Sequence, residues 1–186
     1  MTKIVIISPS VRNGRNSHRI ALYIMNLVRE MNLGDVEILD LLKLNFPLFN
    51  ERLKYQDSPS ADVGEFAGKI RIADGVVIIA PEYNGGYPAS LKNAIDLLTD
   101  EWHRKPVAFV TVSDGNFAGT QVITSLQFIF WKLGALTVPS PMRLPNILKG
   151  FDDNGVPADK PGTDKRASGL LRDLLWMIEA KKRMSP

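Results

Sequence analysis

The sequence contains no cysteine and only two histidines. Without cysteine the chain has no disulfide, no thiol nucleophile and no thiolate metal ligand. His18 and His103 lie far apart in the chain, and we expect neither to be catalytic, although His18 adjoins a polar loop that could bind phosphate. The chain also lacks a G-x-x-x-x-G-K-[ST] loop, a G-x-G-x-x-G turn after a strand and a G-x-S-x-G elbow, and we predict no metal site.

Long apolar runs are absent as well. The longest, near residues 4–7 and 76–80, are far too short to cross a bilayer, so we expect no membrane association. Met1-Thr2-Lys3 leads directly into the first apolar run, which leaves no room for a signal peptide. Together with the absence of cysteine, this favours a cytoplasmic location.

The charge of the chain is nearly balanced, with a formal net charge of +3 at pH 7. Its main basic cluster, residues 181–183, is short and is typical of a helix end or a solvated tail. Nucleic-acid binding would need a larger basic face with aromatic residues in it, so no nucleic acid is expected as a partner. The 186 residues, 45% of them hydrophobic, fit one domain over residues 1–186 with a full core.

What the sequence does contain is a regular alternation of strand and helix patterns. Continuous apolar runs typical of buried parallel strands cover residues 4–7, 76–80 and 107–112, with weaker candidates at 36–39 and 136–138. Helical stripes of apolar residues separate or follow these runs, at residues 20–31, 63–70, 91–98, 122–133 and 171–178. The pattern predicts an α/β fold: a doubly wound, five-stranded parallel sheet of order 2-1-3-4-5 with helices on both faces.

Three polar, glycine-containing loops follow the first, third and fourth predicted strands. They cover residues 10–17, 81–86 and 113–119. Ligands of open parallel sheets bind beyond the carboxyl ends of the strands, where the strand order reverses. In the order 2-1-3-4-5 the three strands are neighbours, so we expect the three loops to converge on one crevice.

The first loop has the composition of a phosphate site. The hydroxyls of Ser10 and Ser17, the amide of Asn16 and the free backbone N–H groups of a helix N-terminus can bind phosphate oxygens. Arg12 or Arg15 can neutralise the charge. The alternative is a solvated arginine loop in which Ser17 only caps the helix.

The second loop suits a planar ligand. Pro81 and the Gly85-Gly86 pair allow the backbone to turn sharply and approach a ligand closely. Tyr83 and Asn84 add an aromatic face and an amide, and Glu82 is either an acid for catalysis or a hydrogen-bond partner. An ordinary turn before a helix is the alternative. The third loop is expected to meet an uncharged part of the ligand, because Asp114 would repel a second phosphate.

Residues 81–96, PEYNGGYPASLKNAID, resemble the signature of the NADPH-dependent FMN reductase family: PEYN, a small pair, Pro and LKNAID. The first loop is similar to that family's GSxR…S element through Ser10, Arg12 and Ser17. The family has a flavodoxin-like fold and includes azo-, quinone- and chromate-reducing flavoenzymes.

The resemblance implies FMN as cofactor and assigns parts of it to the loops. Ser10, Arg12, Asn16 and Ser17 would hold the phosphate, residues 81–85 would line the isoalloxazine, and Ser113 with Gly115 would flank it. The flavin would carry the chemistry, so no catalytic side chain is predicted. The candidate cofactor-binding residues are Ser10, Arg12, Arg15, Asn16, Ser17, Pro81, Glu82, Tyr83, Asn84, Gly85, Gly86, Ser113 and Gly115.

The function predicted is that of an FMN-dependent oxidoreductase, which takes electrons from NADPH or NADH and passes them to a small acceptor such as a flavin, quinone or azo compound. The alternative is a non-enzymatic, flavodoxin-like electron carrier, but such carriers usually present an acidic face and this chain is basic. A signalling receiver domain would need acids after the first strand, where this chain has Ser8-Pro9-Ser10.

Self-association is also expected, because a second subunit could close an open crevice and members of the resembled family commonly form dimers or tetramers. The long segment 41–60 contains Phe46, Leu48, Phe49 and Tyr55 and is the candidate contact surface of a homodimer or homotetramer. The alternative is that these side chains fold back onto the core of their own chain.

Overall fold

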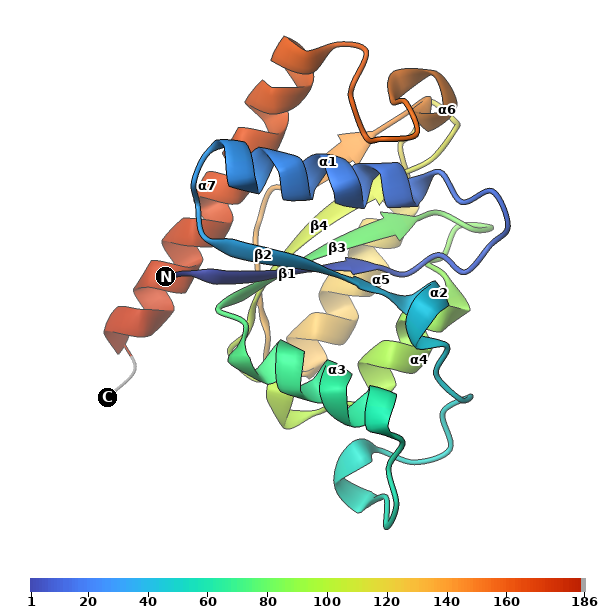
Figure 1. Cartoon of the computed structure of the whole chain (residues 1–186), viewed down its shortest axis with the longest axis vertical. Helices are drawn as coiled ribbons and strands as arrows, with labels where there is room; N and C mark the ends of the chain where they lie inside the picture. The colour runs from blue at the N-terminus through green and yellow to red at the C-terminus, as the bar shows by residue number, and fades with distance from the viewer. Residues whose placement is uncertain (185–186) are drawn as a thin grey trace.

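A parallel sheet forms the centre of the computed structural model, which describes residues 1–184 (Figure 1). The strand order is β2-β1-β3-β4-β5, and β6 also pairs with β4. The bounds of the strands are β1 (Lys3–Ser8), β2 (Asp35–Asp40), β3 (Gly75–Pro81), β4 (Pro106–Val112), β5 (Leu136–Thr137) and β6 (Met142–Leu144). The predicted parallel sheet and its order are therefore confirmed.

The fifth position of the sheet is occupied by two short strands in place of one. β5 pairs with residues 106–107 of β4, and β6 pairs with residues 110–112. Pro139 and Pro141 lie between them, and proline has no N–H to donate to a neighbouring strand. The prediction of one strand over 136–138 therefore found only the first half of this position.

Long helices cover both faces of the sheet, as the apolar stripes predicted (Figure 1). One face packs against α1 (Ser17–Glu30) and α7 (Lys160–Met184). The other packs against α3 (Ala61–Ile72), α4 (Ala89–Asp96) and α5 (Thr120–Lys132). The short helical segments are α2 (Leu41–Leu44), η1 (Leu53–Tyr55), η2 (Asp100–Trp102) and α6 (Ile147–Gly150).

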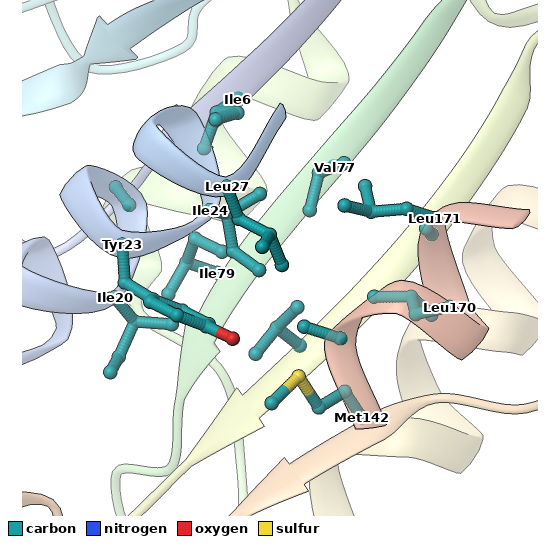
Figure 2. Packing of buried hydrophobic residues seen from close by; sticks show 14 of the residues in the cluster. Ile6, Ile20, Tyr23, Ile24, Leu27, Val77, Ile79, Met142, Leu170 and Leu171 are labelled. Atoms are coloured by element: carbon teal, nitrogen blue, oxygen red, sulfur yellow. The ribbon is translucent and has the colours of Figure 1, made fainter. Parts of the chain in front are cut away.

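The core has two halves because successive strand residues point to opposite faces of the sheet. In β1, Ile6 packs on the side of α1 and α7, whereas Ile7 packs on the side of α3. Figure 2 shows the first half, where Ile24 of α1 and Leu171 of α7 lie on either side of Val77 of β3. These residues have no side-chain surface left for solvent, so α1 is fixed firmly on the sheet.

The loops that follow β1, β3 and β4 leave the same edge of the sheet, on the right in Figure 1. The register aligns Ile7 with Ile78 and Pro81 with Val112, so the strands end nearly level. The N-terminus of α1 opens onto this edge. Within residues 1–184, no helix combines the length and apolar character that crossing a membrane requires.

Candidate functional site

A cleft of about 430 Å³ opens where the three loops meet. All three predicted loops contribute to it, which is the convergence that the strand order implied. The residues that line it are Ser10, Arg12, Gly14, Arg15, Asn16, Ser17, Pro81, Glu82, Tyr83, Val112, Ser113, Asp114, Ile147 and Leu148.

Most of the candidate cofactor residues line this cleft, and four do not. The five candidates of the first loop are all in its wall, together with Pro81, Glu82, Tyr83 and Ser113. The candidates outside the lining are Asn84, Gly85, Gly86 and Gly115. Ser113 Oγ donates a hydrogen bond of 3.0 Å to the carbonyl of Gly115, so this glycine takes part in the internal hydrogen bonding of the third loop.

Asn84 and Gly85 form the sharp turn that carries Glu82 and Tyr83 into the cleft. Tyr83 and Gly86 exchange backbone hydrogen bonds of 2.7 and 3.0 Å around them. Asn84 has φ +53° and Gly85 has φ +79°, and positive φ at both central residues defines a type I′ turn. Asn-Gly is the preferred pair at these positions, so the expected sharp turn is present and Gly85 is the glycine it requires.

Ser17 is the most informative side chain in the cleft. It is the first residue of α1 and is 3% exposed, and its Oγ has no hydrogen-bond partner among residues 1–184. The interpretation of Ser17 as a helix cap is therefore wrong: Asn16 is the N-cap, and neither side chain caps the helix. An unpaired buried hydroxyl is costly, so this atom is one whose hydrogen-bonding capacity the described chain leaves unused at the cleft wall.

Glu82 presents a second polar atom without a partner. Its Oε2 is buried and has no hydrogen bond within the described chain, and its residue lines the cleft. The backbone N–H of Glu82 donates to the Val112 carbonyl at 3.1 Å, which fixes this residue against β4. The cleft therefore has an unused hydroxyl in its first loop and an unused carboxylate oxygen in its second.

The two arginines of the first loop have different environments. The guanidinium of Arg15 forms two parallel hydrogen bonds with the buried carboxylate of Asp40, one of them 2.6 Å from Nη2 to Oδ2. Arg12 is exposed, and its guanidinium forms no hydrogen bond or ion pair within residues 1–184. Arg12 is thus the arginine of the cleft whose charge is not already paired.

Asp40 remains a carboxylate because of this pairing. Burial by itself would raise the pKa of Asp40, but the hydrogen bonds and charge of Arg15, with the N–H of Leu42, outweigh burial and lower it. His18 lies behind the loop, with Nδ1 2.9 Å from Ser8 Oγ, and does not line the cleft. Burial, and then the charge of Arg15, lower the pKa of His18, which favours the neutral imidazole.

Sequence reasoning missed one wall of the cleft. Ile147 and Leu148 of α6 supply apolar surface there, and Gly14, Val112 and Asp114 complete the lining. The N–H of Ile147 donates to the Ser113 carbonyl at 3.4 Å, so α6 stands directly beside the third loop. The available signal was the second half of the fifth strand, Met142–Leu144, which leads α6 to this edge.

These features define a class of protein. A doubly wound parallel sheet whose switch-point cleft has a helix N-terminus at one end is a flavodoxin-like nucleotide-binding fold. Residues 2–146 match the model of the NADPH-dependent FMN reductase family, and the chain belongs to that family.

Known proteins agree with this assignment. The chain is 32% identical over 185 residues to an NAD(P)H-dependent FMN reductase of Schizosaccharomyces pombe, with 92% of this chain and 90% of that protein covered. It is 29% identical over 165 residues to a quinone reductase of Pseudomonas putida, covering 84% and 85%. Its fold is similar to that of the flavoenzyme FerB of Paracoccus denitrificans, with TM-score 0.77, 22% identity and coverage of 96% and 98%.

Proposed function

We propose that the cleft binds FMN, that NADPH or NADH reduces this flavin, and that the electrons then pass to a small acceptor. The observation that carries the proposal is the buried Ser17 hydroxyl without a partner at the N-terminus of α1. It supports an anionic ligand there, because backbone N–H groups and the positive end of the helix dipole lie at the same place.

The phosphate end of FMN fits the first loop. Ser10, Asn16 and Ser17 offer hydrogen-bonding groups, and Arg12 offers a guanidinium that has no partner within the described chain. Arg15 belongs to the same wall and contributes as part of its fixed framework. A phosphate bound here would gain charge-assisted hydrogen bonds from these groups.

The ring end fits the space between the loops after β3 and β4. Pro81, Tyr83 and Ser113 line it, with Ile147 and Leu148 on the wall that α6 provides. We propose that Asn84, Gly85, Gly86 and Gly115 act from outside the lining by holding the two loops in shape. Glu82, whose Oε2 has no partner within the described chain, would offer the ligand a hydrogen-bond acceptor.

When bound, FMN supplies the redox chemistry, because its ring can accept electrons from a nicotinamide and release them to another molecule. The side chains of the cleft bind and orient the cofactor and limit the access of water.

The acceptor is proposed from the relatives and from the shape of the cleft. The relatives named above are an FMN reductase and a quinone reductase, and the cleft walls are partly apolar. A small planar acceptor, such as a second flavin, a quinone or an azo compound, suits both observations. The proposed location is the cytoplasm, where NADPH and NADH are found.

The test is the consumption of NADPH and NADH by the FMN-loaded protein with a quinone or an azo dye. We expect oxidation well above that of free FMN at the same concentration, with little oxidation by protein without FMN. A rate equal to that of free FMN would contradict the enzyme and favour a flavodoxin-like carrier.

We also propose that the protein forms a homodimer or homotetramer through the segment 41–60. Leu48 is 87% and Tyr55 is 62% exposed, and Phe49 is exposed beside them. Phe46 instead packs on Phe66, with ring centroids 5.2 Å apart, so this one aromatic side chain belongs to the chain's own core.

Light scattering should give a molecular mass at least twice that of one chain, and Leu48→Asp should lower that mass. A monomer before substitution would contradict the proposal.

A further inference from the structure

A buried ion pair lies beneath the first loop, between Arg15 and Asp40. Asp40 is the last residue of β2, is 5% exposed, and accepts the N–H of Leu42 at 3.1 Å. The Arg15 side chain is 13% exposed, and its planar guanidinium contacts both carboxylate oxygens. The strand end therefore provides a rigid acceptor for the arginine.

The same guanidinium also holds Ser10. Arg15 Nη1 donates to the backbone carbonyl of Ser10 at 2.9 Å, and the hydroxyl of Ser10 lies 2.6 Å from Tyr83 Oη. Ser10 is fully buried. Because the peptide group is planar, a fixed Ser10 carbonyl also fixes the direction of the next N–H, that of Val11. Arg15 thus sets the path of the first loop, and Tyr83 ties that loop to the one after β3.

The charges of the pair cancel at the cleft. The carboxylate of Asp40 takes up two of the directed N–H groups of Arg15, and the Ser10 carbonyl takes up hydrogen-bonding capacity as well. An exposed cation without a partner is present in the same loop at Arg12. Arg15 therefore contributes to the cleft mainly by fixing the position of the first loop, and less by its positive charge.

We propose that Asp40 is a positioning residue for phosphate binding, which acts through the Arg15 guanidinium on Ser10. The inference deepens the proposed function and rests on it, because the ligand is the phosphate of FMN. Asp40 itself is outside the cleft lining, so its effect on the ligand passes through Arg15. The rival explanation is that Arg15 supplies positive charge and that Asp40 reduces it.

Arg15→Lys separates these two explanations. Lysine keeps the charge and can pair with Asp40, but its single ammonium lacks the planar fork that bridges a carboxylate and the Ser10 carbonyl together. If position matters, the affinity for FMN falls about tenfold, the value of one well-placed hydrogen bond to a charged group. If charge matters, Arg15→Lys binds FMN as the unchanged protein does.

The measurement is the dissociation constant of FMN and of riboflavin, each obtained by quenching of flavin fluorescence. Riboflavin has no phosphate. Arg15→Lys and Asp40→Asn should therefore weaken the binding of FMN about tenfold and leave the binding of riboflavin unchanged. A general loss of structure would weaken both. Asp153→Asn is the control: it removes the carboxylate partner of Arg19 in α1, a more exposed Arg–Asp pair that lies outside the cleft.

A double variant tests whether Asp40 acts through Arg15. Asp40→Asn should add no further loss of FMN affinity when Arg15 is already lysine. Tighter FMN binding by Asp40→Asn, equal losses for FMN and riboflavin, or additive losses would each overturn the inference. If the unchanged protein bound FMN no better than riboflavin, the proposed phosphate site itself would fail, which is a distinct result.

Discussion

At the residue scale, the proposed site depends on buried polar atoms that have no hydrogen-bond partner within residues 1–184. A buried hydroxyl normally has a partner, and the cost of leaving one unpaired is about 1–3 kcal/mol. Ser17 and Glu82 are both in this condition, and both line the same cleft. The chain therefore carries a small energetic cost at this site that a ligand can remove.

Ser17→Ala should separate stability from binding. Because Ser17 Oγ bonds to nothing within residues 1–184, its removal should leave the melting temperature unchanged or slightly higher. FMN should bind about tenfold more weakly, since a charged acceptor loses one donor. Fluorescence titration and thermal unfolding give the two numbers, with Ser125→Ala as the control, because that hydroxyl bonds to the Val122 carbonyl of its own helix. Unchanged FMN affinity would remove Ser17 from the site.

Arg12→Ala should weaken the binding of FMN, because the positive charge of the guanidinium is lost. Its guanidinium is exposed and has no partner in the described chain, so the folded protein loses little when it is removed. We expect FMN affinity to fall several-fold and to depend less on salt than before, because an exposed cation is screened by ions. Titrations at low and high ionic strength test this, with riboflavin as the control ligand. An unaltered salt dependence would show that the phosphate is not near Arg12.

At the scale of single elements, the turn after β3 is the most constrained part of the site. Gly85 has φ +79°, and an L side chain in this region costs about 1–2 kcal/mol. Gly85→Ala should therefore lower the free energy of unfolding by about that amount and slow the reduction of bound flavin by NADPH, because the turn carries Glu82 and Tyr83.

A glycine elsewhere gives the matched control for this turn. Gly68 lies inside α3, and a Cβ there would meet nothing within 4 Å. Gly68→Ala should raise stability by about 0.8–1 kcal/mol, because alanine favours the helix. Urea unfolding of both variants should thus give shifts of opposite sign. Equal and small shifts would show that the turn does not require positive φ.

The C-terminus of α3 depends on a buried lysine. Lys105 is 3% exposed, and its Nζ donates to the carbonyls of Arg71 and Ala73. Burial, with a smaller effect from the charge of Lys181, lowers the pKa of Lys105 to about 8. Between about 8 and its ordinary value of 10.5, the unfolded chain holds more protons on this lysine than the folded one.

The stability that Lys105 contributes should therefore grow as the pH rises through that interval and shrink as the pH falls through it. Urea unfolding of the wild-type protein and of Lys105→Met at several pH values measures it. The free energy of unfolding of the wild-type protein minus that of Lys105→Met should be larger at pH of about 10.5 than at about 8. A difference that does not change with pH would show that Lys105 is not perturbed by burial.

The elements differ in how well the sequence predicted them. Uninterrupted runs such as residues 76–80 predicted central strands correctly, because burial on both faces leaves no polar position. The fifth strand was found only in part, since Pro139 and Pro141 break its hydrogen bonds and divide its apolar residues. The wall formed by α6 was missed because this helix has only 4 residues, too few to show a helical pattern of apolar residues.

At the scale of the whole molecule, the sheet order carried most of the site prediction. It placed the three loops at one edge, and the cleft is there. Pairings between distant segments were beyond the sequence: nothing local shows that Arg15 pairs with Asp40 or that Ser17 lacks a partner. Such facts depend on side-chain positions that are set only when β2 and α1 pack on β1.

The central claim is that this cleft holds FMN with its phosphate at the N-terminus of α1. A crystal structure of the protein with FMN tests it most directly. We predict electron density for the phosphate within hydrogen-bonding distance of Ser17 Oγ, and for the ring between the loops after β3 and β4. A cleft that stays empty in saturating FMN, or a flavin bound at another surface, would contradict the account.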